Sequence, residues 1–449
     1  MAEYRPIGFI DDERAKGVRI HGVKVLGSRD QLPHLAASLE VGSVLVAMPT
    51  AAPETIRETI ALARRSGVED IKLVPSLSEL YTGRVEQGTL REVRPEDLMK
   101  RDPVSVDIKA LEEFLNGRTV LVTGAAGSIG SEICRQVLRF GASHLVAVDF
   151  NETDLFHLEQ ELLRRFPDRT TTVEVADVRD RHRVAALFDT VSPHVVYHAA
   201  AYKHVPMMEA FPCEAVKANV MGTRNVLEEA CKSMCDAFVQ ISTDKAVNPT
   251  SVMGTTKRVA ELLVRSCADQ ITTRCVAVRF GNVLGSRGSV MGTFKEQIAQ
   301  RRPVTVTHPD MRRYFMVTSE AVQLVLQAGA VGRGGEVLVL DMGEPVKIVD
   351  LAKDLIRFYG LEPDRDIPII YTGLRPGEKL FEELLTAEEG TDSTAHERLY
   401  IARMGKPEVG WESDLAKLTE AAEEGDATRV LEMLERLVPR YHANRHPSE

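Results

Sequence analysis

The sequence predicts an α/β fold built on a doubly wound parallel sheet, with a smaller substrate lobe and a truncated nucleotide-fold domain at the N-terminus. Two observations carry this prediction. Short buried strands alternate with helix-length stretches from Arg118 to about residue 385, and such alternation is typical of a parallel sheet. A glycine-rich turn then connects the first of these strands to the helix that follows it.

The chain has 449 residues, of which 44% are hydrophobic and 27% charged, as in ordinary globular proteins. At roughly 150 residues per domain, this length predicts two or three domains. We expect a truncated nucleotide-fold domain over residues 1–100, a linker over 101–117 and a nucleotide-binding domain over 118–284. Residues 285–449 would mainly form the substrate lobe and C-terminal helices, with some segments returning to the nucleotide-binding domain.

Charge and hydropathy exclude several classes of protein. The chain has 56 Lys and Arg against 66 Asp and Glu, a net charge of −10, which argues against nonspecific binding of nucleic acid or anionic lipid. No apolar run reaches the roughly 18–20 residues of a membrane span, and no signal peptide opens the chain. Six scattered cysteines predict neither a disulfide scaffold nor a metal site. We therefore expect a cytoplasmic protein with no membrane span.

The N-terminal region alternates strands and helices. Strands are predicted at residues 6–10, 23–27, 43–48 and 70–75, with a helix over 53–66. Strands separated by helices predict a parallel sheet. Because the region opens on a strand and lacks a phosphate loop, we expect a nucleotide fold without its first βα unit.

The end of the chain is predicted to be helical. Residues 412–424 are acidic, and apolar residues between 430 and 438 recur with a period of about 3.6. We expect a helical tail whose second part is amphipathic.

A dinucleotide site is predicted at the glycine-rich turn. The buried strand 119–123 runs into residues 124–130, in which Gly124, Gly127 and Gly130 are three apart. The first glycine permits the tight bend, the second lets backbone approach a pyrophosphate, and the third allows close helix–strand packing. The helix N-terminus, with Ser128 and Ile129 in its approach, then faces the anion. This pattern is the fingerprint of a Rossmann domain.

An acid after the second strand indicates which dinucleotide is bound. Asp149 ends the strand 145–148 and lies 19 residues after Gly130. A carboxylate at this place would bind the adenosine ribose hydroxyls and repel a 2′-phosphate, so NAD is favoured over NADP.

Two further strand ends are predicted to contact the cofactor. Asp177 and Val178 follow the strand 172–175 and are candidates for the adenine edge, although a simple surface turn explains the pair nearly as well. Ala199 and Ala200 end the strand that begins at Val195. Their small side chains would leave room for a flat cofactor above the sheet.

Polar residues mark the end of the fifth strand and the helix after it. The strand 239–243 leads into Thr243-Asp244-Lys245, and the next helix carries Met253 and Lys257. With the glycine turn and Asp149, this order resembles the extended short-chain dehydrogenase/reductases, whose helix carries Tyr-x-x-x-Lys on one face. Met253 occupies the tyrosine position, and a thioether is neither an acid nor a base. By itself, this substitution suggests an inactive enzyme or an NAD-sensing protein.

Longer motifs narrow the resemblance. The chain is similar over nearly its whole length to the bacterial UDP-N-acetylglucosamine 4,6-dehydratases, particularly the large, membrane-tethered polysaccharide-biosynthesis branch. That branch also has methionine at the tyrosine position. Its members have transmembrane helices and a complete first nucleotide-fold domain, and many are tethered to the cytoplasmic face of the inner membrane. The motifs that carry the resemblance span residues 200–206, 242–249, 279–286, 305–316 and 375–379.

The resemblance implies an NAD-dependent dehydration of UDP-N-acetylglucosamine to a UDP-4-keto-6-deoxy-HexNAc. C4 is oxidised, the C6 hydroxyl is eliminated with the C5 proton, and hydride returns to C6, so the reaction is redox-neutral. The product would enter bacterial surface polysaccharide or glycan synthesis. Similarity to the large branch favours retention at C5, and the superfamily often pairs, so we expect a homo-oligomer such as a dimer.

By the same resemblance, Asp244 would protonate the departing hydroxyl and Lys245 would be the base at C5. Thr243 would hold the C4 oxygen in place of the missing tyrosine, and Lys257 would contact the nicotinamide ribose. These roles need a protonated Asp244 and a neutral Lys245. An ion pair between the two groups instead favours an ionised Asp244 and a protonated Lys245. Adjacent strand residues also point to opposite faces, so the chain must turn within the tripeptide. The alternative interpretation is a surface ion pair.

Residues from later segments are expected to hold the UDP-sugar. Asn282 would meet the diphosphate, and arginines would supply positive charge for the pyrophosphate or the uridine ribose. Glu378 would contact the ribose, and Thr305 with Val306 would flank the uracil. The full set of residues expected to bind the substrate is Lys203, Asn282, Thr305, Val306, Arg313, Arg375 and Glu378.

Two other functions stay open on the sequence. A UDP-sugar 4-epimerase has the same fold, but the missing tyrosine argues against it. A non-catalytic NAD- or UDP-sugar-binding regulator would bind both ligands without turnover. The sequence also leaves open the C5 stereochemistry and the group that deprotonates the C4 hydroxyl.

Overall fold

A computed structural model of the chain describes residues 5–14, 16–48, 51–74, 90–93, 107–267, 272–386, 389–394, 396–405 and 407–441. These residues form two compact units, each assembled from distant segments. The smaller unit takes described residues from 1–103, 293–305 and 349–370, and the larger unit those from 104–292, 306–348 and 371–449. The two units are defined by how their residues pack. The predicted domain bounds concern parts of the chain that fold separately, so they stay a prediction.

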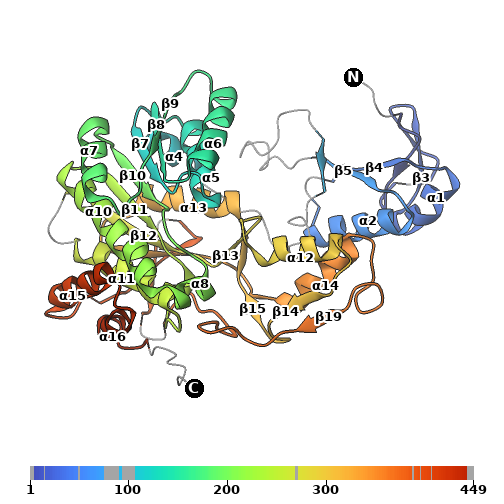
Figure 1. Cartoon of the computed structure of the whole chain (residues 1–449). Coiled ribbons are helices and arrows are strands. Elements are labelled where there is room, and N and C mark those ends of the chain that lie inside the picture. Colours follow the sequence, from blue (N-terminus) through green and yellow to red (C-terminus); the bar gives the residue numbers. More distant parts are fainter. Residues whose placement is uncertain are drawn as a thin grey trace. The chain divides into compact units, whose positions relative to one another are not determined.

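A sheet of nine strands lies at the centre of the larger unit, counted over the described residues (Figure 1). Seven strands run parallel in the order β9-β8-β7-β10-β11-β12-β17, and β21 and β20 continue the sheet antiparallel. The order reverses between β7 and β10, and ligands bind beyond the carboxyl ends at such a switch point. The strands are β7 (Thr119–Thr123), β8 (His144–Asp149), β9 (Thr170–Val175), β10 (Val195–His198), β11 (Ala237–Ile241), β12 (Arg274–Arg279), β17 (Glu336–Leu340), β20 (Thr391–Ser393) and β21 (Leu399–Ala402).

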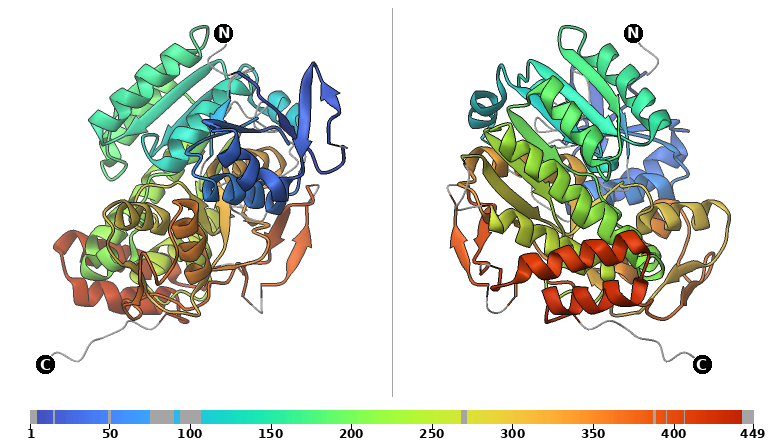
Figure 2. Two further views of the ribbon diagram at one scale, coloured as in Figure 1. Left: turned by 90° about the vertical axis from the view of Figure 1, so that its right-hand side faces the viewer. Right: turned by 60° about the vertical axis from the view of Figure 1, so that its left-hand side comes forward.

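Helices cover both faces of this sheet, because successive residues of each buried strand point to opposite sides. In β7, Val120 and Val122 enter one hydrophobic core and Leu121 enters the other. The right-hand view of Figure 2 shows α15 and α16 alongside the helices of the second core. The first core is covered by α4 (Ile108–Leu115), α5 (Ser128–Arg139), α6 (Glu152–Arg165) and α13 (Thr318–Val331), and the second by α7 (Arg181–Val191), α10 (Gly222–Lys232), α11 (Val252–Ser266), α15 (Trp411–Glu424) and α16 (Ala427–Leu437).

The doubly wound parallel sheet is therefore confirmed, and the predicted helical tail forms α15 and α16. β11 ends at Ile241, two residues before the predicted end of the strand, because the chain enters a 3-10 turn, η4 (Asp244–Ala246). The antiparallel strands β20 and β21 were not predicted from the sequence. They form an antiparallel pair within a polar segment that carries little periodic signal.

Shorter elements complete both units. β13 (Asn282–Leu284) pairs with β16 (Phe315–Val317), and β15 (Arg312–Arg313) pairs with β18 (Val346–Lys347). The other elements are α8 (Val205–Ala210), α9 (Pro212–Val216), the π-helix η3 (Lys217–Met221), α12 (Val290–Ala299), β14 (Val304–Val306), α14 (Ile348–Phe358) and β19 (Ile369–Tyr371).

The smaller unit corrects one expectation. Instead of a single parallel sheet, the described strands of its N-terminal region form two mixed sheets, β1-β3-β2 and β4-β5-β6, each with one antiparallel pair. β2 and β3 form a hairpin around His21 and Gly22, which both have positive φ, and such a turn favours antiparallel strands. The elements are β1 (Phe9–Ile10), β2 (Arg19–Ile20), β3 (Val23–Gly27), η1 (Arg29–Gln31), α1 (Leu32–Ser38), β4 (Ser43–Val46), α2 (Pro53–Arg65), β5 (Asp70–Leu73) and β6 (Arg91–Glu92).

Within the part of the chain that the structure describes, no helix combines the length and apolar character needed to cross a bilayer.

Candidate functional site

The glycine-rich turn between β7 and α5 is packed too closely for side chains. Gly124 has a φ of +65°, and a Cβ added to it would lie 2.6 Å from the backbone nitrogen of Ala200. A Cβ on Gly130 would lie 2.0 Å from the carbonyl oxygen of Gly124. Gly127 is the N-cap of α5, which begins at Ser128. The turn thus brings a helix N-terminus and bare backbone to the switch point, as an anion site requires.

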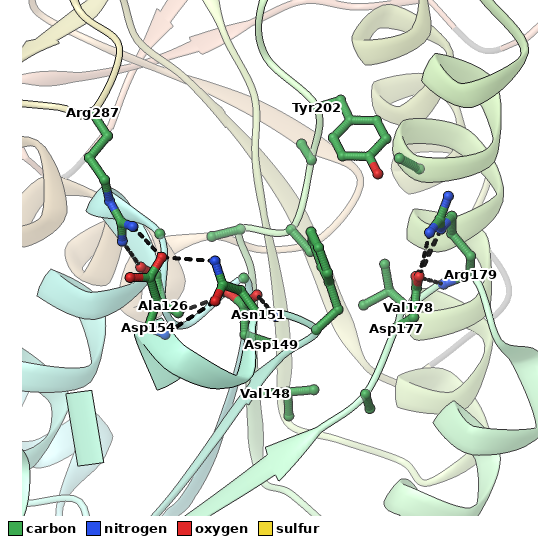
Figure 3. A pocket seen from close by; sticks show the side chains of 18 residues that line it. Ala126, Val148, Asp149, Asn151, Asp154, Asp177, Val178, Arg179, Tyr202 and Arg287 are labelled. Carbon is green, nitrogen blue, oxygen red and sulfur yellow. Dashed lines mark hydrogen bonds and ion pairs between the residues drawn. The ribbon is translucent and has the colours of Figure 1, made fainter. Parts of the chain in front are cut away.

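A pocket of about 270 Å³ opens beside this turn (Figure 3). Its walls come from the ends of the parallel strands and from residues after β13. Of the predicted cofactor residues, Ser128, Ile129, Gly130 and Lys257 are not in this lining; Ile129 packs against the first core. The lining residues are Gly124, Ala126, Gly127, Val148, Asp149, Phe150, Asn151, Asp154, Ala176, Asp177, Val178, Arg179, Ala199, Ala200, Ala201, Tyr202, Ala218 and Arg287.

Asp149 is fixed at one side of the pocket. One carboxylate oxygen accepts the Ala126 N–H at 2.9 Å, and the other accepts the Asn151 N–H at 3.0 Å. The acid at the end of β8 is therefore tied to the glycine turn, as Figure 3 shows. Its proposed contact with a ribose would use the remaining lone pairs of these oxygens.

An ion pair forms the opposite side of the pocket in Figure 3. The Asp177 carboxylate accepts from the Arg179 guanidinium at 2.6 Å, and Val178 lines the wall between them. Burial raises the pKa of Asp177, but the hydrogen bonds from Arg179 lower it further, so the net direction is down. Asp177 is thus held ionised and turned toward Arg179.

Arg287 lies over the glycine turn. Its backbone N–H donates to the Ser128 hydroxyl at 3.1 Å, and its guanidinium donates to the Ala126 carbonyl and to Asp154. Lys203 donates from Nζ to the Arg287 carbonyl at 2.9 Å. The Lys203 ammonium therefore binds the backbone of the loop that carries Arg287, 84 residues further along the chain.

A second cluster lies at the end of β11. The Thr243 hydroxyl donates to Asp244 Oδ1 at 2.9 Å, and Lys245 Nζ donates to the same oxygen at 2.9 Å. The chain turns within this tripeptide, since Thr243 caps η4 and accepts the Lys245 N–H. The turn predicted within the tripeptide is confirmed, and it lets all three side chains meet.

The Asp244–Lys245 pair lies below the surface, with the Lys245 side chain 21% exposed. Asp244 is 0% exposed, and its Oδ2 has no hydrogen-bond partner among the described residues. Lys245 also donates to Asn282 Oδ1 at 3.2 Å and lies 3.8 Å from Glu382 Oε1. Burial lowers the pKa of Lys245, but the carboxylates of Asp244 and Glu382 raise it more, so its net direction is up. The interpretation of a surface ion pair is therefore wrong.

Helix α11 packs directly against this turn. A Cβ on Gly254 would lie 2.2 Å from the Lys245 carbonyl oxygen, so the glycine after Met253 lets helix and turn touch. Met253 and Lys257 are both buried. Burial lowers the pKa of Lys257 to about 8, while Glu261 opposes the change.

The residues predicted to hold the UDP group are only partly brought together. Arg313 is buried, and its guanidinium donates to the Lys379 carbonyl at 2.7 Å and lies 3.8 Å from both Glu378 and Glu382. Arg375 is exposed, and its backbone N–H donates to Glu378 at 3.1 Å.

The predicted uracil contacts stay a prediction. Val306 is buried, and the hydroxyl of Thr305 accepts from Gln297 at 2.8 Å within the smaller unit.

Sequence reasoning missed several residues of these two clusters. Phe150 directly follows Asp149, and Arg179 directly follows Val178, so adjacency to predicted residues could have found both. Arg287 lies one residue beyond a quoted motif, between glycines. Glu382 carried no comparable signal, because its role depends on a contact across 137 residues of chain with Lys245. The missed residues are Phe150, Arg179, Tyr202, Arg287 and Glu382.

Comparison with known proteins shows the family to which this chain belongs. The polysaccharide biosynthesis protein family matches residues 120–404. The capsular polysaccharide biosynthesis protein CapD of Staphylococcus aureus is 46% identical over 89% of this chain and 67% of CapD. A UDP-glucose 4-epimerase of Rickettsia akari is 35% identical over 61% of this chain and 79% of that protein.

Two further matches agree with the fold. An inverting UDP-N-acetylglucosamine 4,6-dehydratase of Campylobacter jejuni is 31% identical over 68% of this chain and 88% of that protein. Pen from Bacillus thuringiensis, a solved structure, is 33% identical with a TM-score of 0.59, over 64% of this chain and 89% of that chain. These matches confirm the resemblance found in the motifs: the chain belongs to the polysaccharide biosynthesis protein family.

Proposed function

We propose that the larger unit binds NAD, with the adenosine half in the pocket beside the glycine turn. The support is the cradle itself, because any side chain at Gly124 or Gly130 would collide with backbone. Asp149 would bind the adenosine ribose and Lys257 the nicotinamide ribose. When bound, NAD would accept hydride from C4 of a sugar and return it to C6.

Arg287→Ala is expected to weaken NAD binding about tenfold, since a charge-assisted hydrogen bond contributes about 1.5 kcal/mol. The guanidinium lies over the turn where the pyrophosphate would bind. Titration of NAD followed by protein fluorescence or calorimetry measures the effect. Arg429→Ala is the control, because Arg429 pairs with Glu424 outside the pocket. Equal NAD affinity in Arg287→Ala and the wild type would contradict the assignment.

Lys257→Met is expected to raise the free energy of unfolding of the NAD-free protein by about 1–3 kcal/mol at pH 7. The buried ammonium costs stability wherever it is charged. Above pH 8 the folded state releases this proton while the unfolded state keeps it to about pH 10.5, so wild-type stability rises and the difference shrinks.

Denaturant unfolding at pH 7 and pH 9.5 measures this difference. Lys109→Met, at a side chain that is 86% exposed, is the control and should change little. The same Lys257→Met variant should lose NAD affinity through its missing ribose contact. A variant that is no more stable at pH 7 and binds NAD normally would refute both roles.

We further propose that the enzyme dehydrates UDP-N-acetylglucosamine to a UDP-4-keto-6-deoxy-HexNAc for surface polysaccharide or glycan synthesis. The observation that carries this proposal is the Asp244–Lys245 pair, bonded at 2.9 Å and packed against a helix with Met253 in place of tyrosine. An acid and a base at one strand end are what an elimination across C5 and C6 requires.

The three side chains would divide the proton transfers. Thr243 would hold the C4 oxygen, and Lys245, as the free amine, would take the C5 proton once C4 is a ketone. The electron pair of the broken C5–H bond forms the C5–C6 double bond, and Asp244 protonates the C6 oxygen that leaves as water. When C6 is then reduced, C5 takes its proton back from Lys245. The proton released from the C4 hydroxyl on oxidation balances the one that Asp244 gave to water. In the ion pair seen in the structure Lys245 holds the proton, so this proton must move to Asp244 before turnover.

Asn282 and Arg313 would hold the diphosphate in this proposal, with Arg375 and Glu378 at the uridine. The contact between Asn282 and Lys245 supports this assignment, because it would put the anion site next to the base.

The competing proposal is a UDP-sugar 4-epimerase, which the similarity to the Rickettsia akari protein favours. A 4-epimerase eliminates nothing from C6, so it would have no use for an acid and a base at Asp244 and Lys245. A binding protein without turnover is the third candidate.

Product analysis separates these functions. The protein is incubated with NAD and UDP-N-acetylglucosamine, and the nucleotide sugar is measured by mass spectrometry. A dehydratase gives a product that lacks one water, an epimerase gives an isomer of unchanged mass, and a binding protein returns the substrate. Only the first outcome supports the proposal.

Retention at C5 belongs to this proposal through the resemblance to the large branch, although the Campylobacter jejuni relative is an inverting enzyme. Turnover in deuterated water labels C5, and NMR of the product assigns the configuration at that carbon. An inverted C5 centre would contradict retention but not the proposed dehydration.

A further inference from the structure

Glu382 lies between the proposed base and the proposed substrate arginine. Its Oε1 is 3.8 Å from Lys245 Nζ and 3.8 Å from an Arg313 guanidinium nitrogen. The side chain is 3% exposed. Its second oxygen, Oε2, has no hydrogen-bond partner among the described residues. One buried carboxyl group is therefore shared by two cations that serve different steps of the proposed reaction.

Charges of both signs act on Glu382. Lys245, Arg313 and Lys379 favour its ionised form, whereas burial and the carboxylate of Asp244 disfavour it. Burial is the largest of these influences, and the pKa of Glu382 is raised above its usual range. A small change in the neighbouring charge can therefore decide whether this group holds a proton.

A UDP-sugar brings such a change. Its diphosphate carries two negative charges and would pair with Arg313, which then neutralises Glu382 less. The new anion also repels a nearby carboxylate. Both effects favour uptake of a proton by Glu382, and Oε2 has a free position for it.

We propose that Glu382 is a positioning residue that takes up a proton from solvent when the diphosphate binds Arg313, and thereby prepares Lys245 to act as an amine. This inference rests on the proposed function for the roles of Arg313 and Lys245. Ionised Glu382 stabilises the Lys245 ammonium in the free enzyme. Neutral Glu382 stabilises it less, so Lys245 gives up its proton more readily once the substrate is in place.

Proton uptake on binding tests this inference. UDP-N-acetylglucosamine has no group of its own that titrates near neutrality, and enzyme saturated with NADH cannot oxidise C4. Calorimetric titration at pH 7 in buffers of different ionisation enthalpy then gives the protons taken up. We expect up to about one proton for the wild type and none for Glu382→Gln. Glu382→Asp keeps a carboxyl group and should retain uptake.

Glu383→Gln is the matched control. Glu383 is the next residue, its side chain is 52% exposed, and it accepts from Asn248 and pairs with Lys379 rather than with Lys245 or Arg313. Uptake in this variant should equal that of the wild type.

The pH dependence of turnover gives a second readout. In Glu382→Gln the free enzyme lacks the carboxylate that favours the Lys245 ammonium, so the rising limb of kcat/KM should move to lower pH. The rising limb of kcat should not move, because Glu382 is already neutral in the complex. If Glu382 had only a structural role, its replacement would lower activity without shifting the limb of kcat/KM relative to that of kcat.

The outcomes are separable from those of the proposed function. No binding heat in any variant would overturn the proposed substrate and this inference with it. Binding with no proton uptake, or with equal uptake in Glu382→Gln and the wild type, would overturn the inference alone.

Discussion

Asp244→Asn is expected to lower kcat by about 10²- to 10⁴-fold while NAD and UDP-sugar binding persist. Asparagine has the shape of aspartate, and its amide oxygen can still accept from Thr243 and Lys245. It cannot give a proton to the departing C6 oxygen. Because Asp244 is completely buried, water cannot replace it as the acid.

Turnover of UDP-N-acetylglucosamine and calorimetric binding measure the two halves of this prediction. Asp236→Asn is the control, since Asp236 lies immediately before the same strand and pairs with Arg118 at a side chain that is 44% exposed. An Asp244→Asn enzyme that retains a tenth or more of wild-type turnover would remove this residue from the acid role.

Gly130→Ala is expected to abolish NAD binding and to destabilise the fold by about 3 kcal/mol or more. The new methyl group would lie 2.0 Å from the carbonyl oxygen and 2.7 Å from the carbonyl carbon of Gly124. Both are backbone atoms of the turn, so relief of the clash requires the turn to open.

Thermal unfolding with and without NAD checks this result. Gly292→Ala is the matched control, because it is also a helical glycine, but its added Cβ would lie 4.0 Å from the nearest atom, Ser289 Oγ. Alanine there should stabilise the protein slightly, by about 1 kcal/mol. A Gly130→Ala protein with wild-type stability and NAD affinity would show that the close packing at this turn is unnecessary.

The central sheet could be predicted from the sequence because its strands are buried on both faces. Such strands are short, apolar and separated by helices, and the strand 119–123 was identified to the residue. The glycine turn was equally clear, since its spacing, its preceding strand and its following helix all agree. Local sequence determines these features.

The smaller unit shows where local sequence is insufficient. The strand at 23–27 was predicted, but its antiparallel partner β2 is only two residues long and depends on the turn at His21 and Gly22. Short strands carry no periodicity, so their pairing is set by tertiary packing.

The residues of the candidate site divide in the same way, into those that the local sequence predicts and those that only the fold brings together. Asp149 and Asp244 lie at the ends of predicted strands, where topology alone collects ligand-binding groups. Arg287 and Glu382 enter from loops whose paths depend on the whole fold. Their positions could be found only in three dimensions.

An isotope tracer tests the central claim most directly. The substrate is UDP-N-acetylglucosamine with deuterium at C4, and the product is examined by mass spectrometry and NMR. The account predicts a product that lacks one water and carries the deuterium at C6. A product of unchanged mass, or one without deuterium at C6, would contradict it.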